Sequence, residues 1–178
     1  MRQDGASEEW SPGTTRLDGD AIGHAAGDLA ELLLRCTAQD DADGASRTEA
    51  RAAALAHWKE AERAAKEGRL VVLASSHGGA ILGAAQFVVA SPRGIAAAPQ
   101  RAEIVQLLAC PSAPRHATVP ALLDRAEEEA RGRGIRILTI ELHAGDPDAA
   151  LLRRRGFRLS GRIPGAGARE RDALVFWK

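Results

Sequence analysis

Apolar residues recur at helical spacing in two stretches of the first third of the chain. From Ala21 onward they fall three or four positions apart, and this spacing predicts a helix that ends near Asp40. The run 46–49 (SRTE) is a capping sequence for a second helix, which ends at Gly68. The apolar positions of the two helices are Ile22, Ala25, Leu29, Leu32, Leu33 and Cys36, then Ala54, Leu55, Trp58, Ala61 and Ala65.

The pattern changes to strand-like runs after this second helix. Residues 70–76 and 80–90 are apolar and of strand length, and the His-Gly-Gly between them favours a tight antiparallel hairpin. A third run, 102–110, precedes a helix whose apolar stripe is Leu122, Leu123, Ala126 and Ala130. The three glutamates at 127–129 are expected to face solvent.

The last third predicts a crossover and a second hairpin. Residues 135–143 are almost continuously apolar, which is typical of a strand buried on both faces, and they should lie parallel to 102–110. A short helix follows over 146–155, and the runs 157–163 and 172–178 form a final antiparallel pair.

These elements predict an α+β fold with a mixed, mostly antiparallel central sheet flanked by helices. Residues 1–13 are rich in Gly, Ser, Pro and acidic side chains, so we expect a flexible leader there. Residues 14–178 then form a single domain.

Charge and composition restrict the partners that the chain can have. Lys and Arg number 24 and Asp and Glu also number 24, and their interspersion argues against nucleic acid as a partner. The two cysteines, Cys36 and Cys110, lack metal-ligand spacing, so we expect small buried residues and no metal site. No signal peptide or membrane-spanning run is visible, which favours a cytoplasmic protein with a small-molecule substrate and no membrane contact. The sheet edges leave a homodimer open.

Two adjoining stretches carry a family resemblance. The sequence AEIVQLLACPSAPRHATVPALLDRAEEEARGRG, followed by IRILTIELHAGDPDAALLRRRGFRLSGRIPG, resembles the GNAT-superfamily N-acetyltransferases. The resemblance covers 69–178, and RAEIVQLLACPSA and GRIPG are most similar to the tabtoxin-resistance type. It implies a GNAT-like acyl-CoA N-acyltransferase fold, acetyl-CoA as co-substrate and a small amine as acceptor.

The phosphate-binding turn of that family is altered in this chain. The family motif, Arg/Gln-x-x-Gly-x-Gly/Ala, can be placed starting at Pro114 or at Arg115, and neither register contains a glycine. Pro120 also lacks an amide hydrogen, although a first helical turn does not require that donor. The turn has therefore either kept the ability to bind the cofactor or kept its fold and lost that ability.

If the cofactor is retained, the resemblance assigns two groups of residues to it. Amides at the start of the helix would meet the pyrophosphate, with added charge from an arginine and a hydroxyl from a threonine; these residues are Arg115, His116, Ala117, Thr118 and Val119. The preceding strand would run alongside pantetheine through the backbone of Leu108, Ala109 and Cys110.

The resemblance also places the catalytic groups. Glu103 matches the position of the general base in several GNAT enzymes, with an ion pair to Arg101 or to another surface arginine as the alternative interpretation. Glu141 and His143 lie two apart on one face of the next strand and are candidate acceptor-site residues, although His143 could equally be a satisfied polar residue.

The expected acid is missing. Leu152 occupies the position of the family's tyrosine, and the chain contains no tyrosine, which leaves Cys110 or a water to protonate the thiolate. Two hypotheses follow: an acetyl-CoA-dependent N-acetyltransferase acting on a small amine, and a catalytically inactive GNAT-like binding module with impaired or lost CoA binding.

Overall fold

The structure of the chain, a computed structural model, describes residue 10 and residues 12–37, 47–89, 101–165 and 171–178. In chain order the elements are β1 (Gly13–Leu17), α1 (Gly19–Thr37), α2 (Arg47–Lys66), β2 (Leu70–His77), β3 (Ala80–Val89), β4 (Arg101–Ala109), α3 (Arg115–Gly132), β5 (Ile137–His143), α4 (Asp148–Arg154), β6 (Arg158–Ile163) and β7 (Ala173–Trp177).

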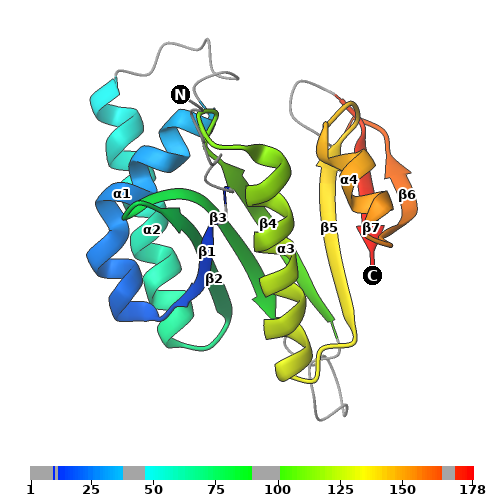
Figure 1. The fold of residues 1–178 in the computed structure, drawn as a ribbon, viewed down its shortest axis with the longest axis horizontal. Coiled ribbons are helices and arrows are strands. Elements are labelled where there is room, and N and C mark those ends of the chain that lie inside the picture. The colour runs from blue at the N-terminus through cyan, green and yellow to red at the C-terminus, as the bar shows by residue number, and fades with distance from the viewer. Residues whose placement is uncertain (1–9, 11, 38–46, 90–100, 166–170) are drawn as a thin grey trace, which may run out of the picture.

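The seven strands form one sheet in the order β1-β2-β3-β4-β5-β7-β6 (Figure 1). Only β4 and β5 are parallel; every other neighbouring pair is antiparallel. The predicted α+β fold with a mixed, mostly antiparallel sheet is therefore confirmed, as is the crossover through α3.

Helices cover both faces of the sheet, and each face has its own hydrophobic core. The core under α3 and α4 contains Phe87, Leu122, Leu123, Leu152 and Phe176. The core between α1, α2 and the opposite face contains Ile22, Leu29, Leu32, Trp58 and Val72. The helical stripes predicted from spacing thus pack on the sheet.

The β2–β3 hairpin is confirmed at the predicted turn. Gly78 and Gly79 have φ angles of 58° and 81°, values that glycine adopts without steric cost and that a two-residue hairpin turn of this kind requires.

Strand β1 was missed by the sequence reasoning. Its residues, GTTRL, alternate weakly and only partly bury their side chains, so their pattern resembles a loop. Pairing with β2 orders them as an antiparallel edge strand, with Gly13 opposite Ser76. Most of the predicted leader, residues 1–9 and 11, lies outside the described residues.

Two predictions of burial were wrong. Strand β5 is not buried on both faces: Ile137 is 40% exposed and Glu141 is exposed on the face opposite α3, because α1 and α2 pack against β2, β3 and β4. Of the three α3 glutamates, only Glu128 is exposed. Glu127 pairs with Lys178, and Glu129, with 12% of its side chain exposed, pairs with Arg125 of the same helix and with Arg133 directly after it.

Candidate functional site

A β-bulge in β4 separates the two parallel strands. Gln86 of β3 pairs with Gln106, but the next residue, Phe87, pairs with Ile104, so Val105 is an extra residue in β4. The β4–β5 pairing covers only 101–104 against 137–140 and ends at this bulge. Beyond it the β4 edge that faces β5 has no strand partner among the described residues (Figure 1).

The unpaired edge of β4 leads to the start of α3. Its five residues, 105–109, provide about 16 Å of free backbone at the usual strand rise. Leu108, Ala109 and Cys110, predicted to run beside pantetheine, lie at its far end with buried side chains. What they can offer to a ligand is therefore backbone, and the amide of Cys110 already donates to Leu82 at 2.8 Å.

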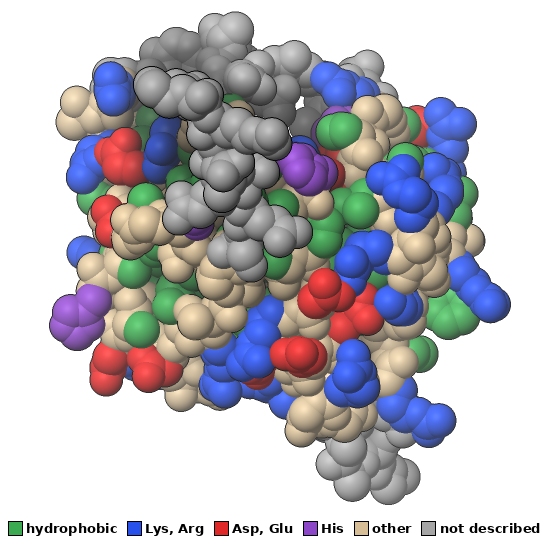
Figure 2. Space-filling view, in the orientation of Figure 1, with side chains coloured by type: hydrophobic (Ala, Val, Ile, Leu, Met, Phe, Trp, Pro, Cys, Tyr) green, Lys and Arg blue, Asp and Glu red, His purple; other side chains and the backbone are tan. Residues whose placement is uncertain are grey.

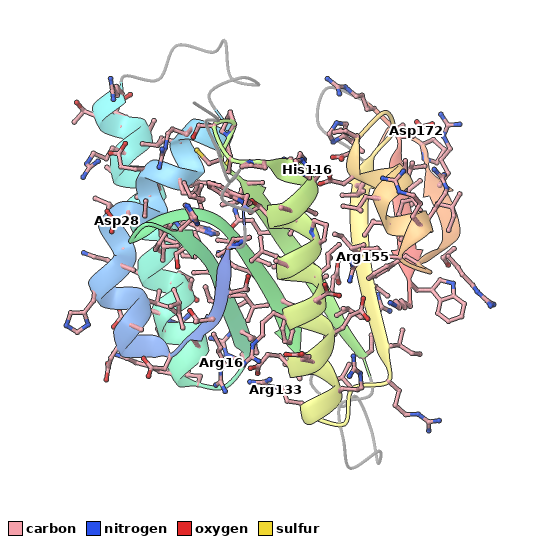
Figure 3. All side chains as sticks on the ribbon, viewed as in Figure 1. Arg16, Asp28, His116, Arg133, Arg155 and Asp172 are labelled. Atoms are coloured by element: carbon pink, nitrogen blue, oxygen red, sulfur yellow. The ribbon has the colours of Figure 1, made fainter. Side chains whose placement is uncertain are left out.

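The first turn of α3 holds the unpaired amides of the site. Helix α3 begins at Arg115, and the amides of Ala117 and Thr118 both donate to the Pro114 carbonyl at 3.0 Å. Within the described residues, the amides of Arg115 and His116 make no hydrogen bond. Figure 3 shows His116 at this end of the helix. Among the predicted phosphate-binding residues, these two therefore have donors to spare.

The remaining predicted residues of this turn point inward. Thr118 and Val119 have no exposed surface, and the Thr118 hydroxyl is buried without a partner among the described residues. Its methyl group lies where a side chain at Gly83 would project, 2.6 Å from the position of an added Cβ. The first turn of α3 thus packs closely against β3.

Pro120 is the sixth residue of α3, not part of its first turn as expected from the sequence. In a regular helix its amide would bond to the His116 carbonyl, so the proline removes one helical hydrogen bond. It does not remove an amide from the end of the helix.

Arg115 is held by a carboxylate from α4. Its Nε donates to Asp148 Oδ1 at 3.0 Å and its Nη2 to Asp148 Oδ2 at 2.5 Å. The Asp148 side chain is 6% exposed, whereas that of Arg115 is 44% exposed. The ion pair raises the pKa of Arg115 and keeps its charge fixed at the first residue of α3.

This pair also bridges the two separated strands, because α3 follows β4 and α4 follows β5. Beside it, His143 Nδ1 lies 3.3 Å from Asp146 Oδ2, and the amide of Asp148 donates to Asp146 Oδ1 at 2.8 Å. His143 thus has the partner that the polar-residue interpretation expected, and its role in acceptor binding stays a prediction.

The bulge also decides what accompanies Glu103. Glu103 pairs with Val88, and Gln106 pairs with Gln86, two positions away on β3, so Glu103 and Gln106 share a face although they are three positions apart on β4. Thr139, opposite Glu103 on β5, puts Glu141 on that face as well. Glu103 is exposed and makes no ion pair or hydrogen bond with any described residue, so the predicted pairing with Arg101 is absent there.

A polar cluster on this face was not predicted. Gln86, 3% exposed, lies 3.0 Å from His57 Nε2 and donates to Gln106 Oε1 at 2.7 Å; His57 Nε2 is 3.3 Å from the same Gln106 oxygen. From its sequence position His57 looked like an ordinary surface residue of a helix. The sequence signal available was a glutamine inside each of two apolar strand runs, which burial allows only with hydrogen-bond partners.

The two cysteines lie near the start of α3. Burial raises the pKa of Cys36, whose Sγ donates to the Ala109 carbonyl at 3.4 Å. Burial also acts to raise the pKa of Cys110, but hydrogen bonds from the Ser112 hydroxyl and amide outweigh it and lower the pKa. Both thiols are free. Leu152, at the tyrosine position, is fully buried in the core and does not reach the gap between the strands.

No group of three or more His, Cys, Asp or Glu among the described residues is placed to hold a metal ion. None of the described helices is long and apolar enough to span a membrane.

The fold and sequence relate the chain to known proteins. The profile of the Acetyltransferase (GNAT) family matches residues 27–157. No curated protein sequence matches.

Solved structures share the fold at low sequence identity. The structure of yncA from Salmonella typhimurium, solved with its cofactor acetyl-CoA, has a TM-score of 0.68 at 18% identity and covers 95% of this chain and 94% of that one. The aminoglycoside 6'-N-acetyltransferase from Enterococcus faecium has a TM-score of 0.70 at 12% identity and coverages of 93% and 95%. The ribosomal-protein-alanine N-acetyltransferase from Brucella melitensis has a TM-score of 0.66 at 20% identity and coverages of 93% and 98%. With a family profile matched over most of its length, this chain belongs to the GNAT acetyltransferase family.

Proposed function

We propose that the chain is an acetyl-CoA-dependent N-acetyltransferase that acts on a small amine, with Glu103 as the base. The supporting observation is the separation of β4 from β5 at the Val105 bulge. It leaves a free strand edge with a charged, amide-bearing helix start at one end and an unpaired carboxylate at the other.

The proposed diphosphate-binding part of the site consists of Arg115 and His116. Their free amides and the guanidinium anchored by Asp148 supply positive charge for a diphosphate without a glycine-rich turn. The amides of Ala117 and Thr118 are already used inside the turn, so their predicted contribution is smaller.

The proposed base, Glu103, lies at the other end of this strand edge, where the acetyl group would react. A pantetheine arm lying along the 105–109 edge from α3 has its thiol end at the bulge, next to the face that carries Glu103. An alkylammonium must lose one proton before its nitrogen can attack a thioester, and an unpaired carboxylate can take that proton directly or through a water. Attack forms the C–N bond, breaks the C–S bond and releases CoA as a thiol.

Calorimetric titration with acetyl-CoA and with CoA tests the cofactor end, and release of free thiol with a panel of small amines tests the transfer. We expect saturable binding of both ligands by the parent protein and by Glu103→Gln. Turnover should fall about a hundredfold only in the variant. Binding without turnover of any amine would leave a CoA-binding module, and absence of binding would overturn the proposal.

A further inference from the structure

We propose that His57, held by Gln86 and Gln106, is a second proton carrier beside Glu103 and takes the place of the missing tyrosine. The inference rests on the proposed acetyl transfer. It gives His57 a proton-carrying role that the family resemblance does not assign to it.

The cluster gives His57 a hydrogen-bond partner in either protonation state. A bare Nε2 accepts from the Gln86 amide nitrogen at 3.0 Å. A protonated Nε2 donates to Gln106 Oε1 at 3.3 Å. One nitrogen cannot do both at once, so the ring gains or loses a proton at Nε2 and exchanges one partner for the other.

The other ring nitrogen is free to act. Nδ1 of the exposed His57 ring makes no hydrogen bond to the described residues. When Nε2 donates to Gln106, a bare Nδ1 can take a proton, and the imidazolium that forms can give that proton up again. When Nε2 accepts from Gln86, the neutral ring carries its one proton at Nδ1. Gln106 thus supports both a base and an acid at the same position, and Gln86 supports the other neutral tautomer.

The cluster lies where the reacting end of the site is proposed. Gln106 and Glu103 share a face of β4 at positions two residues apart along β3, a separation of about 7 Å. Gln86 is buried and donates to Gln106, and its second amide hydrogen has an acceptor when Nε2 of His57 is bare. The ring of Trp58 lies edge-on to the His57 ring, with the two centroids 5.2 Å apart.

The proton balance of the transfer needs two such groups. An alkylammonium loses two protons on becoming an amide, and the departing thiolate gains one. Glu103 takes the first proton and passes it to solvent. His57 takes the second as the C–N bond forms and gives a proton to sulfur as the C–S bond breaks.

Bromoacetyl-CoA tests this position without knowledge of the acceptor. If His57 lies at the acyl end, its ring nitrogen displaces bromide from the bromomethyl carbon, forming a C–N bond and releasing bromide and one proton. Peptide mass mapping should then find the label on His57, and CoA should protect against it. His57→Gln should abolish this label, whereas His24→Gln, which removes an exposed histidine of α1, should leave it unchanged.

The Gln86→Leu variant tests whether Gln86 positions the His57 ring or whether the ring reacts only because it lies near the acyl group. We expect labelling of His57 to slow by about tenfold or more once the ring loses its partner, with CoA affinity unchanged. With any amine that the parent acetylates, His57→Gln should lower turnover about a hundredfold at unchanged acetyl-CoA affinity.

These experiments distinguish a failure of the proposed function from a failure of the inference on His57. If neither CoA nor bromoacetyl-CoA binds by calorimetry, the proposed function fails and this inference fails with it. If both bind and the label falls on His143, on Cys110 or on no residue, the inference alone is overturned. If His57 is labelled equally fast in the Gln86→Leu variant, the proposed positioning of His57 by the glutamines is overturned.

Discussion

At the residue scale, Arg115 combines a structural contact with free donors. A guanidinium has five N–H donors, and Asp148 uses two of them. The carboxylate is buried and the arginine is half exposed, so Asp148 anchors the guanidinium while the arginine side chain stays accessible. An arginine held in this way loses little conformational freedom when it meets an anion.

Replacing Arg115 should therefore weaken binding of the diphosphate in particular. For Arg115→Gln we expect calorimetry to show about tenfold weaker binding of CoA, or 1.4 kcal/mol, and no change for pantetheine, which has no phosphate. Arg154→Gln, at an exposed arginine of α4, is the control. Arg115→Gln should also lower the free energy of unfolding by about 2 kcal/mol, because Asp148 is left buried and unpaired. Equal losses for CoA and pantetheine would contradict the assigned role.

Gly83 is the residue that allows α3 to lie close to the sheet. An added Cβ would lie 2.6 Å from Thr118 Cγ2 and 3.0 Å from the Leu108 carbonyl oxygen. We expect Gly83→Ala to lower the free energy of unfolding by about 1–3 kcal/mol, measured by urea denaturation, because the helix start must move. It should weaken CoA binding as well.

Gly27→Ala is the matched control for Gly83→Ala. An added Cβ at Gly27, an exposed position inside α1, meets no atom within 4 Å. Its substitution should raise stability by about 0.5–1 kcal/mol. A Gly83→Ala protein as stable as the parent would show that the first turn of α3 is not tightly seated.

At the element scale, ion pairs along α3 hold the end of the helix that lies away from the site. Glu129 receives hydrogen bonds from Arg125, at 2.7 Å, and from Arg133, whose guanidinium also lies over the Phe87 ring. Figure 2 shows the mixed acidic and basic side chains on this face. Burial acts to raise the pKa of Glu129, but the Arg133 hydrogen bond and the surrounding arginine charges outweigh it and lower the pKa.

The lowered pKa of Glu129 has a defined effect on stability against pH. A folded-state pKa below the unfolded value contributes stability at neutral pH that is lost as the pH falls through the folded-state pKa. Glu129→Gln should thus cost about 1 kcal/mol at pH 7, and the difference from the parent should vanish in acid, below the ordinary glutamate pKa.

Glu128→Gln serves as the comparison for Glu129→Gln in denaturation series at several pH values. Glu128 is 58% exposed at its side chain and pairs only with Arg125 among the described residues, so its loss should cost under about 0.5 kcal/mol. A pH-independent difference between Glu129→Gln and the parent would show that the pairing does not stabilise the fold.

Element identity was largely readable from the sequence, and element geometry was not. The spacing of Leu122, Leu123 and Ala126 marked α3, and the glycines at 78 and 79 marked the β2–β3 turn, because each signal is local. The Val105 bulge has no local signal, since the residue before it and the residue after it are both ordinary strand residues. That bulge decides where β4 leaves β5 and which side chains join Glu103.

At the scale of the whole molecule, the C-terminal strand joins the two parts of the sheet. β7 lies between β5 and β6, so the last strand in the sequence is an interior strand (Figure 1). Phe176 is fully buried, and the backbone of Lys178 exchanges two hydrogen bonds with Leu138, at 2.8 and 2.9 Å. β5 and β6 belong to one sheet only when β7 lies between them.

Deleting residues 173–178 should consequently prevent cooperative folding. Both β5 and β6 lose their common partner, and the core under α4 loses an aromatic ring. We expect circular dichroism to show no sharp urea transition for the truncated chain. Lys178→Ala, which keeps the strand and removes the pair with Glu127 and the contact of the ammonium with the Phe157 ring, should cost only about 1 kcal/mol. A cooperative transition in the truncated chain would contradict this account.

The sequence by itself determined every described element except β1, their order and the family, because periodicity, turn glycines and the stretch from Ala102 to Gly134 are properties of neighbouring residues. Only the tertiary structure decided the composition of the candidate site. Asp148 reaches Arg115 across 33 positions, and His57 reaches Gln106 across 49. Such pairings depend on register, a bulge and helix packing, which are set by the summed burial of the whole chain rather than by any local pattern.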